Sequence, residues 1–264
     1  YGETITVQVT PDNREAGHYT FADDVSATDA DGYELVVKLD SDYQWQTASA
    51  ENGNDVLGDL TLAWNIVARK IKAPTLDIPE NSRVYTGSSL TATLTYDDKA
   101  VNISFTADDE KDNDGMSRNG ATLTVLHAGG YTVRATLENT SNFVWQEGGT
   151  AEKTLTWQVA KAQNAVTELS IDDWVYGEEA KQPSYRVNFG TAKVVYEYRI
   201  AADGNWESKP APGDAGHYRV TVSVEADENS DWEAAAAVSK EFLVERATVA
   251  KPVLGKFDNM YTGS

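Results

Sequence analysis

Three acidic side chains alternate along one short segment ahead of a glycine: Glu110, Asp112 and Asp114, followed by Gly115. Oxygen ligands at alternate positions near the start of a loop converge on calcium in helix–loop–helix calcium sites. Such a loop ends in a glutamate at its twelfth position, whereas Ala121 stands there in this chain. The segment therefore predicts a solvated hairpin tip, with a calcium site built from the three carboxylates as the alternative.

Tryptophan is the second residue type that could do chemistry, because a flat indole ring can stack on the face of a sugar. Trp64 and Trp157 stand at inward positions of alternating segments, where core packing is expected. Four others lie near predicted loops, and an exposed one at a domain end is the best candidate for a ligand contact. These candidates are Trp45, Trp145, Trp206 and Trp232.

The residues needed for catalysis do not converge in the sequence. The three histidines, His18, His127 and His217, lack the spacing of a zinc site or a catalytic triad. The absence of cysteine excludes disulfides, thiolate metal sites and cysteine nucleophiles. Glycoside hydrolysis needs two carboxyl groups facing each other across a cleft. We therefore predict a protein that is not an enzyme and has no cofactor apart from the calcium alternative.

The charge balance restricts the partners. The net charge is −20, because 42 acidic residues outnumber 22 basic ones. Nucleic-acid phosphates and acidic membrane surfaces would be repelled. No apolar run approaches the roughly 18 residues that span a bilayer, so direct membrane insertion is not expected. A hydrophobic content of 41% is enough to form a buried core.

An internal repeat organises the chain. Four landmarks recur in one order: an opening Tyr-Gly or Tyr-x-Gly, an alternating segment after Gly-Tyr, an Asp or Asn before an aromatic residue, and a last alternating segment that ends in a basic residue. The opening tyrosines are 84, 91 and 85 residues apart, at Tyr1, Tyr85, Tyr176 and Tyr261. An ordered set of landmarks with this spacing indicates tandem units.

Each unit contains short segments in which apolar and polar residues alternate, as in the segment that begins at Tyr131. A period of two is that of a strand with one buried face. Turn signals such as Asp31-Gly32 and Asn119-Gly120 separate about six to seven such strands per unit. The pattern predicts an all-β fold of tandem immunoglobulin-like β-sandwich domains in an elongated array.

The landmarks also predict where the domains divide. The first repeat is expected over 1–76 with its first strand truncated, the second over 77–169 and the third over 170–254. Residues 255–264 would then be the opening strand of a following repeat. An incomplete first unit and a surplus strand predict head-to-tail self-association through 255–264 by strand addition.

One stretch carries a family resemblance. Residues 214–220 resemble the Asp-x-Gly/Ala-x-Tyr-x-Cys stretch of immunoglobulin strand F, with Tyr218 in the tyrosine position and Val220 in the cysteine position. The resemblance implies a tyrosine corner, in which the tyrosine hydroxyl bonds to upstream backbone. The whole unit resembles the tandem immunoglobulin-like repeats of large bacterial surface proteins, MBG-type repeats included. Its motifs are Tyr-x-Gly, Ala-Gly-x-Tyr, Asn-Tyr/Phe-x-Trp and Trp-x-Val-x-Lys.

The resemblance implies a non-catalytic, secreted stalk or adhesive region on the bacterial cell surface, part of a longer chain that spaces or presents a binding region. One alternative is a module that binds a glycan or a host surface protein through end loops and exposed aromatics. Another is a set of accessory domains of a secreted carbohydrate-active enzyme. An exposed aromatic patch on one unit favours binding, whereas equivalent polar surfaces on all units favour the spacer.

Overall fold

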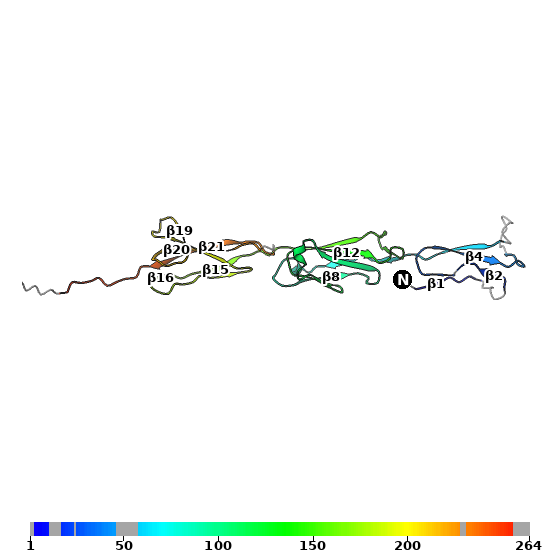
Figure 1. Ribbon diagram of the computed structural model, residues 1–264, viewed down its shortest axis with the longest axis horizontal. Coiled ribbons are helices and arrows are strands. Elements are labelled where there is room, and N and C mark those ends of the chain that lie inside the picture. The colour runs from blue at the N-terminus through cyan, green and yellow to red at the C-terminus, as the bar shows by residue number, and fades with distance from the viewer. Residues whose placement is uncertain (1–2, 11–16, 24, 46–57, 228–230, 256–264) are drawn as a thin grey trace, which may run out of the picture.

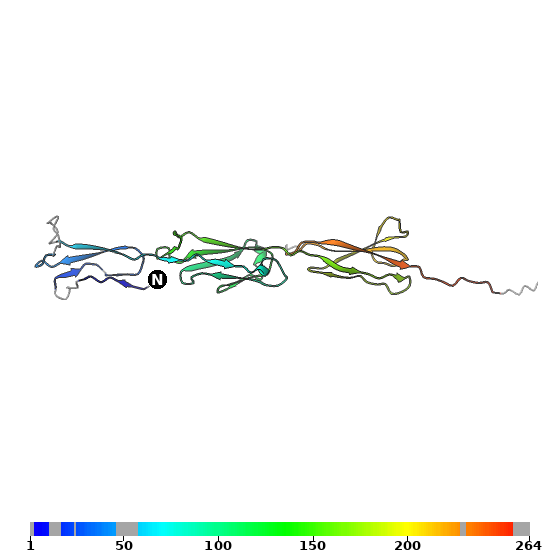
Figure 2. The same cartoon turned by 180° about the vertical axis from the view of Figure 1, so that it is seen from behind.

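The computed structural model describes residues 3–10, 17–23, 25–45, 58–227 and 231–255 (Figure 1). Within these residues the regular structure is β, interrupted by two short 3₁₀ turns. The strands gather in three groups that follow one another along a line, as both views show (Figures 1 and 2). The predicted fold class is confirmed: the chain is an elongated tandem array of immunoglobulin-like β-sandwiches. In the described part, no helix is long and apolar enough to cross a bilayer.

The first group of strands, here called the first repeat, is built on a small core. Its strands are β1 (Ile5–Thr6), β2 (Tyr19–Phe21), β3 (Ser26–Ala27), β4 (Gly32–Leu39) and β5 (Leu60–Asn65). The pair β1–β3 forms one sheet, and the other has the order β2-β4-β5. Between them Tyr19, Leu35 and Val37 are buried. The alternation along β4 thus places its apolar side chains in the core, as predicted.

The second repeat has the most complete sandwich. Its elements are β7 (Thr75–Asp77), η2 (Glu80–Ser82), β8 (Leu90–Thr95), β9 (Val101–Ala107), η3 (Glu110–Asn113), β10 (Ser117–Asn119), β11 (Thr122–Val125), β12 (Gly129–Leu137), β13 (Phe143–Trp145) and β14 (Lys153–Val159). A four-stranded sheet, β10-β11-β8-β7, and a three-stranded sheet, β14-β12-β9, supply its core. Tyr131 and Trp157 face each other across β12 and β14 and are both buried.

The third repeat repeats this design with a larger second sheet. Its strands are β15 (Val166–Ser170), β16 (Trp174–Val175), β17 (Ser184–Val187), β18 (Lys193–Arg199), β19 (Glu207–Lys209), β20 (Gly216–Val224) and β21 (Ala235–Glu245). The five-stranded sheet has the order β16-β21-β20-β18-β19, and β15 pairs with β17. Every second residue of β20 from Tyr218 to Val224 is buried. The strand predicted from the Tyr218 landmark is therefore the centre of this core.

The chain crosses from one repeat to the next in an extended conformation. Strand β6 (Arg69–Ile71) follows the first repeat but pairs in parallel with β13, and its Ile71 is buried in the second repeat. Strands β7 and β15 span the predicted boundaries after residues 76 and 169, and each pairs with a strand that follows it. The domain boundaries remain a prediction. Of the expected extra strand, residues 256–264 lie outside the described part.

A tyrosine corner closes each repeat, as the strand-F resemblance implied. The hydroxyls of Tyr33, Tyr131 and Tyr218 donate to the carbonyl oxygens four residues upstream, over 2.7, 2.8 and 3.0 Å. Each bond ties the turn that precedes β4, β12 or β20 to the strand itself. The turns at residues 29–30, 127–128 and 214–215 are therefore held in equivalent positions.

Buried Tyr131 makes stability depend on alkaline pH. Burial raises the pKa of Tyr131, the charge of Asp112 raises it further, and the bond to the His127 carbonyl opposes the shift. The unfolded chain loses this proton from about pH 10, while the folded chain retains it. The stability that Tyr131 contributes is therefore complete below about pH 10 and is lost as the pH rises further.

The substitution Tyr131→Phe tests this dependence. At pH 7 we expect the variant to lose about 1 kcal/mol of unfolding free energy, because the corner hydrogen bond is gone. Between about pH 10 and 11 the difference from the wild type should shrink, since phenylalanine cannot ionise in the unfolded state. Urea unfolding at several pH values measures both effects. A difference in unfolding free energy that stays constant from about pH 7 to 11 would contradict the predicted pH dependence.

Candidate functional site

The four candidate tryptophans have different surroundings. Trp145 is 1% exposed, and its Nε1 donates to the Ala151 carbonyl over 2.7 Å. Its ring does not face the surface, because β6 pairs with β13 and places Ile71 beside it. The sequence predicted a position near a loop for Trp145 and gave no sign of this pairing with the preceding linker. Trp232 lies where the second and third repeats meet, 5.8 Å from the Phe189 ring. Both rings pack against neighbouring side chains, and a ligand contact by either remains a prediction.

Trp206 is half-buried, and cations lie against it. The guanidinium carbons of Arg199 and Arg219 are 4.2 and 4.8 Å from its ring centroid. These distances are those of cation–π contacts. The ring thus already has two partners from β18 and β20, and a sugar contact by Trp206 remains a prediction.

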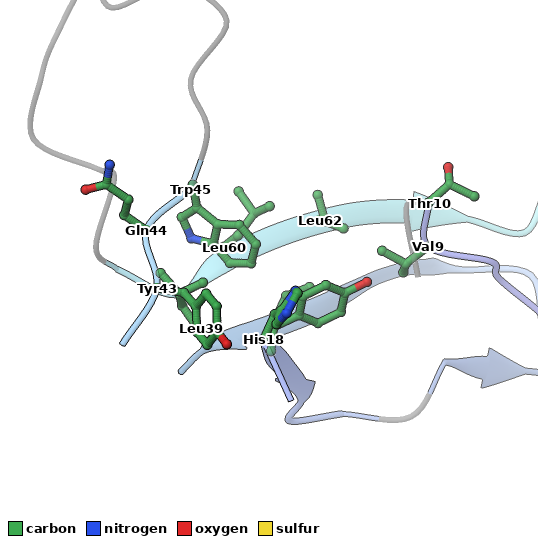
Figure 3. A pocket seen from close by; sticks show the side chains of 11 residues that line it. Val9, Thr10, His18, Leu39, Tyr43, Gln44, Trp45, Leu60 and Leu62 are labelled. Atoms are coloured by element: carbon green, nitrogen blue, oxygen red, sulfur yellow. The ribbon is translucent and has the colours of Figure 1, made fainter. Parts of the chain in front are cut away.

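Trp45 lines a cavity of about 470 Å³ in the first repeat (Figure 3). Its Nε1 donates to the Gly58 carbonyl over 2.8 Å, which holds the indole in place. The walls are mainly apolar and aromatic and include His18, Leu39 and Tyr43. The cavity lies beside the Leu39 end of β4. Among the four candidates, Trp45 therefore has the surroundings that best fit a ligand contact at a domain end.

The predicted calcium trio is not assembled. Residues 110–113 form the 3₁₀ turn η3 instead of the expected hairpin tip, because the Asp109 side chain caps it by accepting from the Lys111 N–H. Asp112 points inward, is 2% exposed and pairs with the Lys111 ammonium over 2.6 Å. The side chain of Asp114 is 87% exposed. Among the described residues, no group of three or more His, Asp or Glu side chains is close enough together to hold a metal ion. Calcium binding by Glu110, Asp112 and Asp114 remains a prediction.

The buried carboxylate of Asp112 requires a glycine opposite it. A Cβ at Gly129 would lie 2.1 Å from Asp112 Oδ2. We expect Gly129→Ala to cost about 1–3 kcal/mol of stability, because the carboxylate is enclosed and cannot move aside cheaply. Gly32→Ala is the control, since that turn leaves open space for a Cβ. Urea unfolding measures both variants, and equal losses would show that the close approach is not the cause.

The junction between the first and second repeats is held by one buried amide. Asn142, at the start of the aromatic turn of the second repeat, is 7% exposed. Its Oδ1 accepts from the Ala30 N–H over 2.5 Å, and its Nδ2 donates to Asp29 Oδ1 over 2.7 Å. The Asn142 carbonyl accepts from the Arg69 N–H over 2.8 Å. One side chain thus binds the corner turn of the preceding repeat, and its backbone binds the linker.

The junction between the second and third repeats has the same construction with other residues. Asp231 is 3% exposed, and its Oδ1 accepts from the Ala128 N–H over 2.7 Å. Its Oδ2 lies 2.8 Å from His127 Nδ1. The Asp231 carbonyl accepts from the Ala162 N–H over 2.9 Å. The two junctions therefore share their geometry and differ in the chemistry of one polar pair.

A polar side chain shortly upstream accepts a hydrogen bond from the backbone of each of these residues. The backbone N–H of Asn142 donates to the Asn139 side chain, and that of Asp231 donates to the Asp227 side chain. In the first repeat, the N–H of Asp42 donates to the Asp40 side chain. Such bonds from a short polar side chain to nearby backbone fix a turn. Asp42, Asn142 and Asp231 are matched by their place before an aromatic residue in the sequence.

Aromatic packing completes the second junction. The Tyr85 ring lies 5.5 Å from that of Phe189 and 6.1 Å from that of Trp232. Burial raises the pKa of Tyr85, and the charges of Asp231 and Asp227 raise it further. The Tyr-x-Gly landmark, recognised in sequence only as the opening of a unit, thus contacts the next repeat.

Sequence reasoning identified the landmark before each aromatic but assigned no role to Asn142 or Asp231. It also treated His127 as a structural turn residue. The detectable signal was positional, because Asp29 and His127 each precede a corner tyrosine by four residues. What the residues bind could not be detected, since their partners are more than one hundred positions away. The hydrogen bonds of Asn142 and Asp231 can fix the orientation of neighbouring repeats.

Comparison with known proteins identifies no family: the chain matches no family model. No curated protein matches it. A solved structure of the eight N-terminal Ig domains of Down Syndrome Cell Adhesion Molecule is similar at 16% identity, with a TM-score of 0.32. That match covers 94% of this chain and 35% of the other, so the chain spans about a third of that structure.

Two further solved structures are similar at comparable levels. Three N-terminal domains of the bacteriophage RB49 Highly Immunogenic Outer Capsid protein match at 11% identity and a TM-score of 0.31, over 87% of this chain and 88% of the other. Fibronectin(III)-like modules of Clostridium thermocellum CbhA match at 15% identity and a TM-score of 0.21, over 70% of this chain and 100% of the other. Likeness at this level carries no functional argument. The fold assignment accordingly rests on the sheets described above.

Proposed function

We propose that the chain is a non-catalytic extracellular stalk or adhesive region that holds a binding region away from the bacterial surface to which a longer protein is attached. The observation that carries this proposal is the repeated junction. Two successive repeats are each joined to the one before by a buried Asn or Asp that binds its corner turn. A linker without such contacts would let neighbouring domains tilt freely.

The energetics support a stiff array. Each junction combines hydrogen bonds to a buried side chain with extended-chain pairing of the linker to the next repeat. A buried hydrogen bond contributes about 1 kcal/mol, and more where a charged group takes part. Two or three of them at each junction favour one orientation over the alternatives. The net charge of −20 favours solubility in an exposed setting.

Small-angle X-ray scattering tests the proposal. Three sandwiches of strands of about nine residues placed end to end span roughly 100 Å, which gives a radius of gyration of roughly 30 Å. A compact globule of this length would have about 18 Å. We expect the extended value, with little change between low and high salt. A compact value, or a broad ensemble of bent shapes, would overturn the proposal.

A binding module is the second candidate, and the cavity around Trp45 favours it. Its apolar and aromatic lining suits a sugar face or an apolar side chain of a host protein. We expect a glycan array probed with the chain to give signals that Trp45→Ala removes. Trp206→Ala, at the other half-buried surface candidate on the third repeat, shows whether any lost signal is specific to the cavity around Trp45. Binding that survives Trp45→Ala, or no binding at all, would remove this cavity as the ligand site.

A further inference from the structure

A third copy of the receiving turn stands at the end of the third repeat. The Tyr218 hydroxyl donates to the Asp214 carbonyl over 3.0 Å and accepts from the Asp214 N–H, so the corner is formed. Ala215 follows Asp214 just as Ala30 follows Asp29 and Ala128 follows His127. The side chain of Asp214 is 64% exposed, and its Oδ2 pairs with the Lys209 ammonium over 2.7 Å, whereas no such pair is described for its Oδ1. In the described part of the chain, no following repeat lies against this turn (Figure 1).

Apolar residues at this end and on the chain that leaves it are exposed, whereas their counterparts inside the chain pack against the next repeat. Tyr176 is the counterpart of Tyr85, and it is 52% exposed although Tyr85 packs on the next repeat. Val249 follows Phe242 by seven residues, as Ile71 follows Trp64, and it is 90% exposed whereas Ile71 is 1% exposed.

A second pair of counterparts shows the same contrast. Leu254 comes two residues after Pro252, as Leu76 comes two after Pro74. Leu254 is 94% exposed, whereas Leu76 packs against the core of the second repeat. The positions that a following repeat covers inside the chain are therefore open at this end.

The polar pairs at the two junctions obey one electrostatic rule. An acidic turn residue, Asp29, meets an amide, Asn142, and a histidine, His127, meets an acid, Asp231. Neither junction places two carboxylates face to face. Two carboxylates at hydrogen-bond distance in a buried site repel each other, and burying an unpaired charge adds a desolvation cost.

We propose that the turn at Asp214 and Ala215, together with Tyr176 at the same end of the sandwich and Val249 and Leu254 on the chain that leaves it, is a docking surface for a further immunoglobulin-like repeat that presents an asparagine before its aromatic residue. The inference rests on the proposed function and names the partner of the next junction. The Ala215 N–H donates to the amide oxygen of the incoming asparagine. The amide nitrogen of that asparagine donates to the Asp214 carboxylate, as the amide nitrogen of Asn142 donates to Asp29.

The same rule excludes the first repeat of this chain as the partner. Asp42 precedes its aromatic residue as Asn142 does, so docking it on Asp214 would place two carboxylates beside the single ammonium of Lys209, which already pairs with Asp214 over 2.7 Å. The head-to-tail self-association predicted from residues 255–264 is therefore disfavoured in the register of the internal junctions. The turn accepts an asparagine repeat and rejects an aspartate repeat.

An extended chain tests this pairing. Residues 1–254 are continued by a second copy of residues 77–264, so that a repeat carrying Asn142 follows Asp214. Because the chain has no cysteine, nitroxide labels can be placed at two introduced cysteines without other changes. One label replaces exposed Lys240 of the original third repeat, and the other replaces exposed Thr154 of the added copy. Pulsed electron-spin resonance then measures the distance distribution across the new junction.

We expect one narrow distance peak for the asparagine copy and a broad distribution after Asn142→Asp in that copy. Adding Asp214→His to the aspartate version should restore the narrow peak, because it recreates the His127–Asp231 pair. Equal widths for the asparagine and aspartate copies, or no recovery with histidine, would overturn the inference.

The same two positions labelled in the 264-residue chain report on its native second junction and separate the two proposals. A broad native distribution would mean that the stiff array itself is wrong. A narrow distance peak at the native junction together with a broad distribution at the junction to the asparagine copy would overturn only the proposed docking surface.

Discussion

Trp157→Ala is expected to lower the free energy of unfolding of the second repeat by about 3–5 kcal/mol, the usual cost of removing a large buried aromatic side chain. The Trp157 side chain is fully buried, and its ring centroid lies 5.8 Å from that of Tyr131. Its Nε1 also donates to the Ser82 carbonyl over 2.8 Å. The substitution therefore leaves a cavity and an unpaired carbonyl next to η2.

The equivalent tryptophan of the first repeat supplies the control. Trp64 is half-buried, stacks on Tyr33 at 4.6 Å, and its Nε1 has no hydrogen-bond partner among the described residues. Trp64→Ala should cost about 1–2 kcal/mol, because less area is buried and no hydrogen bond is lost. Urea unfolding, with the repeats distinguished by NMR signals, measures both losses. Similar losses would show that the contrast in burial does not control stability.

Asp231→Ala is expected to loosen the junction between the second and third repeats more than any other single change at this junction. It removes the acceptor of the Ala128 N–H and the partner of His127, and hydrogen bonds to a charged group are worth about 1.5–3 kcal/mol. The cores of both repeats keep their side chains, so their own unfolding should change little. The expected result is a smaller radius of gyration in solution and a broader distance distribution across this junction.

Asp203→Ala is the matched control for this change. It removes the same charge from an exposed loop of the third repeat, away from the junction. We expect it to leave the radius of gyration unchanged. If both variants scatter like the wild type, the bonds of Asp231 do not set the orientation of the repeats.

The junctions give the array a property that its separate sandwiches lack. The corner tyrosines Tyr33 and Tyr131 each hold a turn within their own repeat, and a backbone N–H of the same turn binds the next repeat. Stability within a repeat and orientation between repeats are thereby linked through Tyr131 and Ala128. In the stalk proposed above, these junctions would limit bending without disulfides, since the chain has no cysteine.

The amino-acid sequence alone determined the β-sandwich class, the repeat and the corner tyrosines. Strands such as β12 and β20 were predictable because a period of two shows directly which side of a strand is buried. The corner at Tyr218 was predictable because its partner lies only four residues away. Both signals are local, so one segment of sequence contains them completely.

Only the tertiary structure decided what happens at the ends of each sandwich. Trp145 is buried because Ile71 of the preceding linker lies beside it, and Asp112 turns inward on a 3₁₀ turn because Gly129 leaves room for it. Asn142 and Asp231 lock junctions through partners more than one hundred residues away. A period of two shows which side chains of a strand face the core. The residues at the ends of a sandwich are buried by contact with a neighbouring repeat, and no local sequence pattern shows where that neighbour lies.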